Sequence, residues 1–259
     1  MENHSYGAVI GAADAPYINS IAGECGLATN YHNVTHPSLP NYIAATSGLD
    51  LASLDPFTSD CDPAGACTTN TESIFAQGES WKAYEESMPS NCDRSDAGNY
   101  AVRHNPPAYY SALIGCSSND VPYDHLATDL ARNALPNFSF ITPNLINDMH
   151  NGTLADGDTW LAHNLPTLLD SPEYAVGGTA IFLTWDEGEG GSSNDCASNT
   201  TDVGCHVAAL VISPSTKAGT RSADLFNHYS LLATAEEMLG LPKLGQAASN
   251  ASMVNPFNL

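Results

Sequence analysis

The pattern of apolar and polar positions divides the chain into helix-length and strand-length segments. Apolar residues recur at helical spacing in five segments, and the predicted helices cover residues 15–24, 39–48, 123–135, 158–170 and 228–240. Short apolar runs predict strands at residues 138–142, 179–185 and 206–213, with a further strand candidate at 27–34. The runs at 179–185 and 206–213 are almost entirely apolar, which is typical of buried parallel strands.

Strand-like and helix-like segments alternate along the chain, and this order predicts an α/β domain with a mostly parallel sheet. Residues 50–72 and 89–121 are rich in turn-forming residues, so we expect loop insertions there rather than a second domain. In such sheets, ligands bind beyond the carboxyl ends of the strands. Three polar stretches follow strand candidates and define the candidate site, namely "THPSLPNY" (35–42), "TPNLINDMHNG" (142–152) and "DEGEGG" (186–191).

The composition disfavours several classes of function. With 259 residues, 42% of them hydrophobic, the chain can bury a substantial core, and no apolar run approaches the ~20 residues that span a membrane. Acidic residues number 29 and basic residues 7, and the net charge of −22 disfavours binding to nucleic acid or to anionic membranes. Such a charge fits a protein that works in acid or one that works in high salt, and the sequence leaves both open.

The cysteines predict disulfides and an oxidising compartment. Two close pairs lie in loops rich in Gly, Ser, Thr and Asp, namely Cys61 with Cys67 and Cys196 with Cys205, and Cys92 and Cys116 also lie in loop-like stretches. Reduced thiols or zinc ligands are the alternative, but the sequence contains no C-x-x-C motif. Cys25 is left over, and we expect it to be buried.

Two acidic stretches offer hard oxygen ligands for a metal ion. Asp186 and Glu187 end an apolar strand and precede glycine, and a divalent cation would relieve the repulsion between adjacent carboxylates in a partly dry site. A solvated acidic turn is the alternative. Glu2 and Asn3 offer the same ligand types, although their position fits a chain terminus without a role equally well.

Other polar residues are ambiguous when taken alone. Asp148 and His150 lie in an Asn-rich stretch that fits either a turn or a site. Asp158 lies at a predicted helix start, where helix capping by Asp158 or Asp156 is the simpler interpretation. His206 begins a strand, and a lone histidine is more often packed or on the surface than catalytic.

Ser38 has two compatible interpretations. With Pro40 in the first turn, it fits the N-cap of the predicted helix at 39–48. A hydroxyl at a helix N-terminus also faces free backbone N–H groups and the positive end of the helix dipole, where a phosphate oxygen is stabilised. A metal ion bound to that hydroxyl would lower its pKa and make it a nucleophile.

Seven stretches, taken in order, resemble one family of enzymes. They are "MENHSY", "THPSLPNYIAATSG", "PNLINDMHNG", "GDTWL", "TWDEGEGG", "HVAALVISP" and "NHYSLLATAEEMLGL", and the resemblance extends from residue 2 to about residue 241. The family is the phosphoesterase family of bacterial and fungal acid phosphatases and non-specific phospholipases C, in the alkaline phosphatase superfamily. The resemblance implies a doubly wound α/β fold, with a mostly parallel sheet sandwiched by helices, that hydrolyses phosphate esters.

The resemblance also implies roles for individual residues. Ser38 would be the nucleophile and would contact one divalent metal ion, whose other ligands would be Glu2, Asn3, Asp186 and Glu187. The residues implied to contact phosphate or to transfer protons are Asp148, His150, His206, Asp158 and His36. Mostly oxygen ligands suggest Ca²⁺, Mg²⁺ or Mn²⁺, with Zn²⁺ as an alternative. We expect one phosphoesterase domain over residues 1–259. In the family, an apolar strand precedes the Glu-Asn pair, so the first strand of the domain would lie upstream of Met1.

The expected function is therefore that of a secreted or cell-surface acid phosphatase, extracellular or periplasmic, that acts on a small phosphate ester through a phosphoserine intermediate. A phospholipase C-like diesterase is the near alternative. A non-catalytic, calcium-stabilised extracellular binding protein is an alternative from another class. We expect no nucleic-acid partner and no stable membrane insertion, and the sequence leaves the oligomeric state open.

Overall fold

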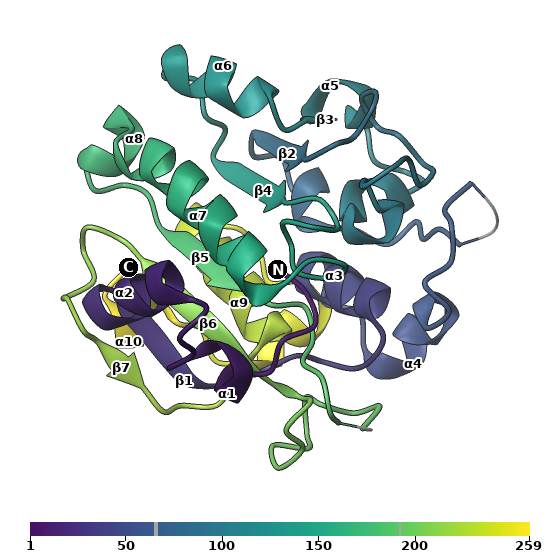
Figure 1. The fold of residues 1–259 in the computed structure, drawn as a ribbon. Coiled ribbons are helices and arrows are strands. Elements are labelled where there is room, and N and C mark those ends of the chain that lie inside the picture. The colour runs from purple at the N-terminus through teal and green to yellow at the C-terminus, as the bar shows by residue number, and fades with distance from the viewer. Residues whose placement is uncertain (65–66, 192) are drawn as a thin grey trace.

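The computed structural model describes residues 1–64, 67–191 and 193–259, and its strands form two sheets (Figure 1). The first sheet has the order β5-β6-β1-β7, with β8 also paired to β1, and the second has the order β3-β2-β4. The strands are β1 (Gly26–His32), β2 (Trp81–Glu85), β3 (Asp120–Pro122), β4 (Phe138–Thr142), β5 (Ile181–Thr184), β6 (His206–Ile212), β7 (Arg221–Ser222) and β8 (Phe226–Asn227). All four strands expected from the sequence are thus found within two residues of their predicted bounds, and β4 matches its prediction residue for residue.

The sheets are mixed rather than purely parallel. β1 runs parallel to β7 and β8, and β2 runs parallel to β3 and β4. β6, however, runs antiparallel to both of its neighbours, β1 and β5. The expectation that the apolar runs 179–185 and 206–213 are parallel strands is therefore wrong for this pair, because an apolar run reports burial and not strand direction.

Helices cover the sheets, as the alternating pattern predicts. Those of at least seven residues are α2 (Pro16–Glu24), α3 (Ser38–Ser47), α6 (His125–Ala131), α7 (Leu154–Leu169) and α9 (His228–Leu239). The shorter ones are α1 (Tyr6–Val9), α4 (Leu51–Leu54), α5 (Cys116–Asn119), α8 (Pro172–Ala175) and α10 (Val254–Phe257), and five 3-10 turns complete the set in the described residues. α7 begins four residues earlier than predicted because Thr153 and Asp156 form a capping box ahead of it. No helix among the described residues is both long enough and apolar enough to cross a bilayer.

Two apolar clusters hold the layers together. In one, Ile18 of α2 and Leu161 of α7 pack with Leu210 of β6. In the other, Ile43 of α3 and Leu232 of α9 pack with residues of β2 and the 3-10 turns. The chain thus forms one α/β unit in which α7 and α9 belong to different clusters.

Disulfides close the loops that the sequence analysis identified. Cys61 is bonded to Cys67, Cys92 to Cys116, and Cys196 to Cys205. These six sulfurs are therefore not free to bind zinc, and the bonds fit an extracellular protein. Cys25 is unpaired, as expected, but it is partly exposed rather than buried.

A second pair of buried acidic residues lies in the sheet formed by β3, β2 and β4. Asp120 of β3 is fully buried, with Oδ2 accepting a hydrogen bond from Asn105 Nδ2 at 2.9 Å. Glu85 of β2 lies beside it, and burial together with the charge of Asp120 raises the pKa of Glu85. Burial also raises the pKa of Asp120 to about 7.

The raised pKa of Asp120 predicts a fold that is more stable in acid. Protonation of Asp120 stabilises the folded state, and this stability is lost as the pH rises from the ordinary aspartate pKa of 3.8 to the pKa of about 7 in the folded protein. We expect Asp120→Asn to increase the free energy of unfolding more at pH ~7.5 than at pH ~4.5, by at most about 4 kcal/mol. Urea denaturation at both pH values measures this difference, with Asp124→Asn, at an exposed aspartate whose side chain makes no capping bond, as the control. An equal effect at both pH values would contradict the prediction.

Candidate active site

The nucleophile candidate lies at the start of α3, close to where β1 and β5 end. Ser38 is the first residue of the helix, and Pro37 occupies the N-cap position, so the prediction that Ser38 is the N-cap is wrong. The Ser38 hydroxyl makes no capping hydrogen bond. It is buried, and it is free to face other side chains at the helix N-terminus.

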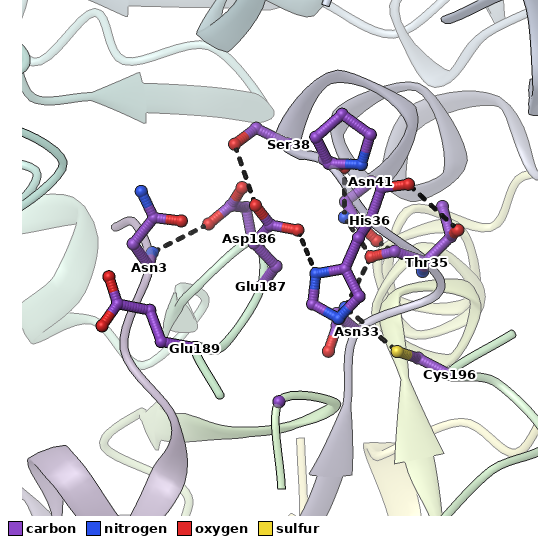
Figure 2. Close-up of polar contacts among 12 residues, drawn as sticks. Asn3, Asn33, Thr35, His36, Ser38, Asn41, Asp186, Glu187, Glu189 and Cys196 are labelled. Carbon is purple, nitrogen blue, oxygen red and sulfur yellow. Dashed lines mark hydrogen bonds and ion pairs between the residues drawn. The ribbon is translucent and has the colours of Figure 1, made fainter. Parts of the chain in front are cut away.

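Asn41 fixes the turn that leads into α3. Its Oδ1 accepts hydrogen bonds from the backbone N–H groups of Val34 and Thr35 at 2.9 and 3.1 Å. Its Nδ2 donates to the carbonyl oxygens of Thr35 and Pro37 at 2.8 and 3.0 Å. With all four of these hydrogen-bonding sites in use, one buried amide determines where Ser38 sits, which explains the composition of "THPSLPNY" (Figure 2).

Three buried carboxylates surround the Ser38 hydroxyl. Ser38 Oγ lies 3.1 Å from Glu2 Oε2 and 3.5 Å from Glu187 Oε1. Asp186 lies beside them, and its Oδ1 accepts a hydrogen bond from the backbone N–H of Asn3 at 3.4 Å (Figure 2). The structure therefore brings together all five residues that the resemblance implies as metal ligands.

The electrostatics of this cluster fit a cation. Burial and the charge of Asp186 raise the pKa of Glu2, and burial and the charge of Glu187 raise the pKa of Asp186. Asp186 Oδ2 is buried and has no hydrogen-bond partner among the described residues. Carboxylate oxygens, an amide side chain and a hydroxyl are the donors that hard divalent cations prefer. A divalent cation among them would offset the repulsion between the carboxylates and would supply a partner for the unpaired oxygen.

Asp148 organises a second group on the far side of Glu2. Its Oδ2 lies 3.0 Å from His104 Nδ1, its Oδ1 accepts the backbone N–H of His150 at 2.7 Å, and its carbonyl oxygen accepts the backbone N–H of Glu2 at 2.8 Å. His104 Nε2 in turn lies 3.3 Å from Glu2 Oε1. Ligand atoms of Glu2, His104 and His150 all lie within 4.8 Å of one another, so this group could also contribute to a metal site.

Positive charge reaches this site through Arg103. Its guanidinium lies 3.1 Å from His150 Nε2, and because arginine only donates, Nε2 is the acceptor and a neutral His150 carries its proton on Nδ1. That Nδ1 is 2.8 Å from Asn151 Oδ1. Asp60 lies nearby, with its Oδ1 accepting the backbone N–H of Leu39 at 2.9 Å, and Arg103 acts to lower the pKa of Asp60 against the effect of burial.

Two other histidines support the carboxylates. His36 Nδ1 pairs with Glu187 Oε2, so His36 contacts a candidate ligand rather than Ser38 itself. His228 Nε2 bonds the backbone carbonyl of Asp186 at 2.6 Å, and its Nδ1 lies 3.0 Å from the Tyr31 hydroxyl. Burial lowers the pKa of His228 to about 4, so it is neutral at ordinary pH and acts as a fixed dipole.

Two residues implied by the resemblance make their contacts elsewhere. His206 stacks on Tyr6 with ring centroids 4.4 Å apart, and its Nε2 bonds the carbonyl oxygen of Thr29 at 3.1 Å. Asp158 accepts the backbone N–H groups of Tyr17 and Ile18 at 3.2 and 2.7 Å, at the start of α2. These contacts favour structural roles for both residues. Asp158 belongs to α7, but it caps the N-terminus of α2.

We expect Asp158→Ala to reduce stability rather than catalysis. The change leaves two N–H groups at the start of α2 without their acceptor, which should cost about 1–2 kcal/mol, or roughly 2–6 °C in Tm. Thermal denaturation and initial rates on folded protein measure the two effects separately. Asp156→Ala, which removes the exposed capping box of α7, is the matched control. A loss of turnover at unchanged Tm would contradict this assignment.

The sequence analysis did not identify His104, Arg103 or Tyr42 as site residues. His104 and Arg103 lie in a 3-10 turn (Val102–His104) within the stretch expected to be a loop insertion, and nothing in the local pattern marks them. Tyr42, which donates its hydroxyl hydrogen to Glu2 Oε1, reads as part of the apolar face of α3. The one signal in the sequence that could have identified Arg103 is the scarcity of positive charge, since the chain has only 7 basic residues.

Comparisons with known proteins agree with this geometry. The model of the Phosphoesterase family matches residues 2–242. The phosphatidylinositol-3-phosphatase of Mycobacterium tuberculosis is 32% identical over 250 residues, which cover 96% of this chain and 77% of that protein. The acid phosphatase of Aspergillus fumigatus is 30% identical over 247 residues, which cover 90% of this chain and 53% of that protein. The chain thus spans about half the length of the fungal relative.

Solved structures show the same fold at low sequence identity. An inactive variant of murine ectonucleotide pyrophosphatase/phosphodiesterase 5, in complex with AMP, superposes with a TM-score of 0.63 at 12% identity, covering 100% of this chain and 97% of that chain. A protein of the alkaline phosphatase superfamily from Vibrio parahaemolyticus has a TM-score of 0.56 at 12% identity, covering 91% and 64%. The fold is therefore alkaline phosphatase-like, as the resemblance implied.

Proposed function

The chain belongs to the phosphoesterase family, a family of phosphoric ester hydrolases, and from that premise we propose that it is a metal-dependent phosphomonoesterase with Ser38 as its nucleophile. The observation that carries the proposal is the Ser38 hydroxyl. It makes no capping bond, it lies at a helix N-terminus, and it faces the carboxylates of Glu2 and Glu187. A serine with a purely structural role would have no need of these buried acids.

In the first step, Ser38 Oγ attacks phosphorus, and the bond from phosphorus to the leaving alcohol breaks. The hydroxyl proton passes to a carboxylate, and Glu2 Oε2 at 3.1 Å and Glu187 Oε1 at 3.5 Å are the acceptors within reach. The positive end of the α3 dipole and the guanidinium of Arg103 stabilise the negative charge on the phosphoryl oxygens. His150, when it is protonated on both ring nitrogens and no longer accepts from Arg103, supplies the Nε2 proton to the leaving alcohol and becomes neutral.

In the second step, water attacks the phosphoserine. The bond between phosphorus and Ser38 Oγ breaks, Ser38 regains its proton, and inorganic phosphate leaves. His150 takes the proton from the attacking water, the reverse of its first role. Asp148 serves as a positioning residue, because it is fully buried and holds His150, His104 and Glu2 through three hydrogen bonds.

Glu2, Asn3, Ser38, Asp186 and Glu187 would hold one divalent cation. When bound, the cation would lower the pKa of the nucleophilic hydroxyl and neutralise charge that develops on phosphate oxygen. The chain's contribution is to keep three carboxylates buried and oriented around Ser38, with His36 fixing Glu187 and His228 fixing the Asp186 backbone. The largely oxygen donor set favours Ca²⁺, Mg²⁺ or Mn²⁺, and Zn²⁺ would require a nitrogen ligand such as His104.

The three disulfides and the curated acid phosphatase relatives support secretion and activity in acid. The substrate would be a small phosphate monoester.

The test compares hydrolysis of p-nitrophenyl phosphate and p-nitrophenyl phosphorylcholine from pH ~4 to ~9, before and after removal of metal with a chelator. We expect faster turnover of the monoester, loss of turnover with chelator, and recovery on adding divalent metal. Faster turnover of the diester would favour a phospholipase C-like enzyme, and no turnover of either ester with metal supplied would favour a binding protein.

Arg103 should distinguish monoesters from diesters. A monoester carries one more negative charge than a diester, so it gains more from the guanidinium. We expect Arg103→Gln to lower kcat/KM for p-nitrophenyl phosphate by about 10–100-fold and to lower the diester rate less. Arg94→Gln, at an exposed arginine, is the matched control. Equal losses on both esters would contradict a role in reading the substrate's charge.

A further inference from the structure

An acidic side chain from a neighbouring loop caps the helix that begins at Ser38. Asp60 Oδ1 accepts the backbone N–H of Leu39, the second residue of α3, at 2.9 Å. Pro37 and Pro40 have no N–H group, so among the first four positions of the helix only Ser38 and Leu39 offer a backbone donor. Asp60 therefore occupies one of the two backbone donors at the helix end that attracts phosphate oxygens.

The loop fixes the position of Asp60 from both sides. The backbone N–H of Asp60 donates to the carbonyl oxygen of Phe57 at 3.1 Å, and Phe57 is buried in the same apolar cluster as α3. On the other side, the carbonyl oxygen of Cys61 accepts the Tyr109 hydroxyl at 2.9 Å, and Cys61 is held by its disulfide to Cys67. Asp60 has a φ of 49°, in the left-handed region that aspartate adopts more readily than most residues. The loop thus holds this carboxylate at the end of α3.

Asp60 lies close to the same positive groups that would bind phosphate. Burial raises the pKa of Asp60, and the Leu39 N–H acts to lower it. The charges of Arg103 and His150 also act to lower this pKa, so both side chains lie near the carboxylate. A phosphoryl group attacked by Ser38 would be stabilised by Arg103 and by the N-terminus of α3. The carboxylate and the phosphoryl group would therefore share one set of positive charges and lie near each other.

The second carboxylate oxygen of Asp60 is available to a ligand. Asp60 Oδ2 has no hydrogen-bond partner among the described residues, and the side chain is partly exposed. An ionised carboxylate only accepts hydrogen bonds. A phosphate oxygen without a proton would be repelled by it, whereas an oxygen with a proton would donate to it in a charge-assisted hydrogen bond. The carboxylate can therefore distinguish two anions that differ only in whether they carry a proton.

We propose that Asp60 is a specificity-determining residue that selects phosphate groups with a protonated oxygen, and that its Oδ2 accepts the hydrogen bond from this P–OH group. The inference rests on the proposed function, because it places the phosphate beside Ser38. The selected substrate form is the monoanion of a phosphate monoester, which predominates below pH ~6. Above that pH, the dianion keeps its attraction to Arg103 but meets Asp60 without a proton. Diesters and sulfate esters have no such proton, so Asp60 disfavours both.

A role for Asp60 as a helix cap alone predicts a different result. The side-chain oxygen of asparagine accepts a backbone N–H as well as that of aspartate, so Asp60→Asn keeps the cap on α3. The change replaces the free acceptor with an NH₂ donor, which can bond to an anion that carries no proton. A cap alone therefore predicts unchanged anion selectivity in Asp60→Asn, and selection by the carboxylate predicts its loss.

The test compares the binding of inorganic phosphate and of sulfate by calorimetry, with Mg²⁺ supplied. At pH ~8 both are mainly tetrahedral dianions, and only phosphate carries a proton. We expect the wild type to bind phosphate at least ~30-fold more tightly than sulfate, and Asp60→Asn to reduce this ratio about 10-fold or more, mainly through tighter binding of sulfate. Asp62→Asn is the matched control, because it makes the same charge change at an exposed position of the same loop. We expect it to keep the wild-type ratio.

A second neutral variant, Asp60→Ser, keeps the test decisive if Asp60→Asn does not fold. We expect the same loss of selectivity, because a serine hydroxyl can donate to sulfate. Three outcomes would overturn the inference. They are a wild type without preference for phosphate, an unchanged ratio in the folded Asp60 variants, and an equal loss of selectivity in Asp62→Asn.

The binding measurements and the turnover measurements fail separately. Loss of selectivity in the Asp60 variants of a protein that hydrolyses no phosphate ester would remove the proposed function and leave the role of Asp60 in place. Turnover of p-nitrophenyl phosphate together with an unchanged ratio in the Asp60 variants would remove the role of Asp60 and leave the proposed function in place.

Discussion

Replacing Ser38 with alanine is expected to lower kcat for p-nitrophenyl phosphate by about 10⁴-fold or more, because the account gives no other group the role of forming a bond to phosphorus. The change also removes a candidate metal ligand, but it leaves the fold of the turn intact, because Asn41 and not Ser38 holds that turn. Steady-state kinetics with metal supplied measure the loss. Circular dichroism and Tm show that the variant is folded.

Ser47→Ala is the matched control for this change. Ser47 is a buried serine at the other end of α3, and its hydroxyl bonds the Ile43 carbonyl at 2.7 Å. We expect its activity to stay within about 2-fold of wild type, since removing its two neutral hydrogen bonds, to the Ile43 carbonyl and from the Leu49 N–H, affects stability rather than the site. Turnover that survives in Ser38→Ala at the level of Ser47→Ala would remove Ser38 as the nucleophile.

Replacing Asp186 with asparagine is expected to act on activity and stability in opposite directions. The buried carboxylate of Asp186 is repelled by Glu187, which raises its pKa, so a neutral amide should make the metal-free protein more stable. The same change removes one negative charge from the candidate metal ligands and should weaken metal binding by about 10²-fold or more, with a similar loss of kcat/KM. Strain of this kind is typical of functional sites.

Calorimetric titration with Ca²⁺, Mg²⁺, Mn²⁺ and Zn²⁺ measures the binding, and thermal denaturation with chelator measures the stability. Glu189→Gln is the matched control, because Glu189 is an exposed acid on the same loop and keeps its backbone contact with Ser5. Unchanged metal affinity in Asp186→Asn, or a fall in the Tm of the metal-free protein, would contradict the assignment of Asp186 as a ligand.

The spacing of apolar residues predicted the helices and strands whose formation depends on residues that are close in sequence. The apolar run at 138–142 gave β4 without error, and helical spacing located α2, α3 and α9 to within one or two residues. Asp186 and Glu187 could be identified as site candidates because they directly follow an apolar run, and the structure places Glu187 within 3.5 Å of the Ser38 hydroxyl. The sequence indicated that Asp158 could cap a helix, but it did not indicate which helix. Asp158 caps α2, which lies about 140 residues away in the sequence.

What the sequence could not show depends on contacts between distant segments. Arg103 and His104 approach the site only because their turn packs against α3, far from "NDMHNG" in the chain. The connections that lead into and out of β6 set its antiparallel direction. The amino-acid composition of β6 does not indicate this direction. The resemblance implied that His206 contacts phosphate or transfers a proton, but its ring stacks on Tyr6.

The most direct measurement is acid quenching of the enzyme during turnover of p-nitrophenyl phosphate, followed by peptide mass spectrometry. We predict one phosphoryl group on the peptide that contains Ser38, with fragmentation placing it on the serine hydroxyl, and none in Ser38→Ala. A phosphoryl group on a histidine, or turnover without any phosphorylated peptide together with inversion at phosphorus of a substrate made chiral by oxygen isotopes, would contradict a phosphoserine mechanism.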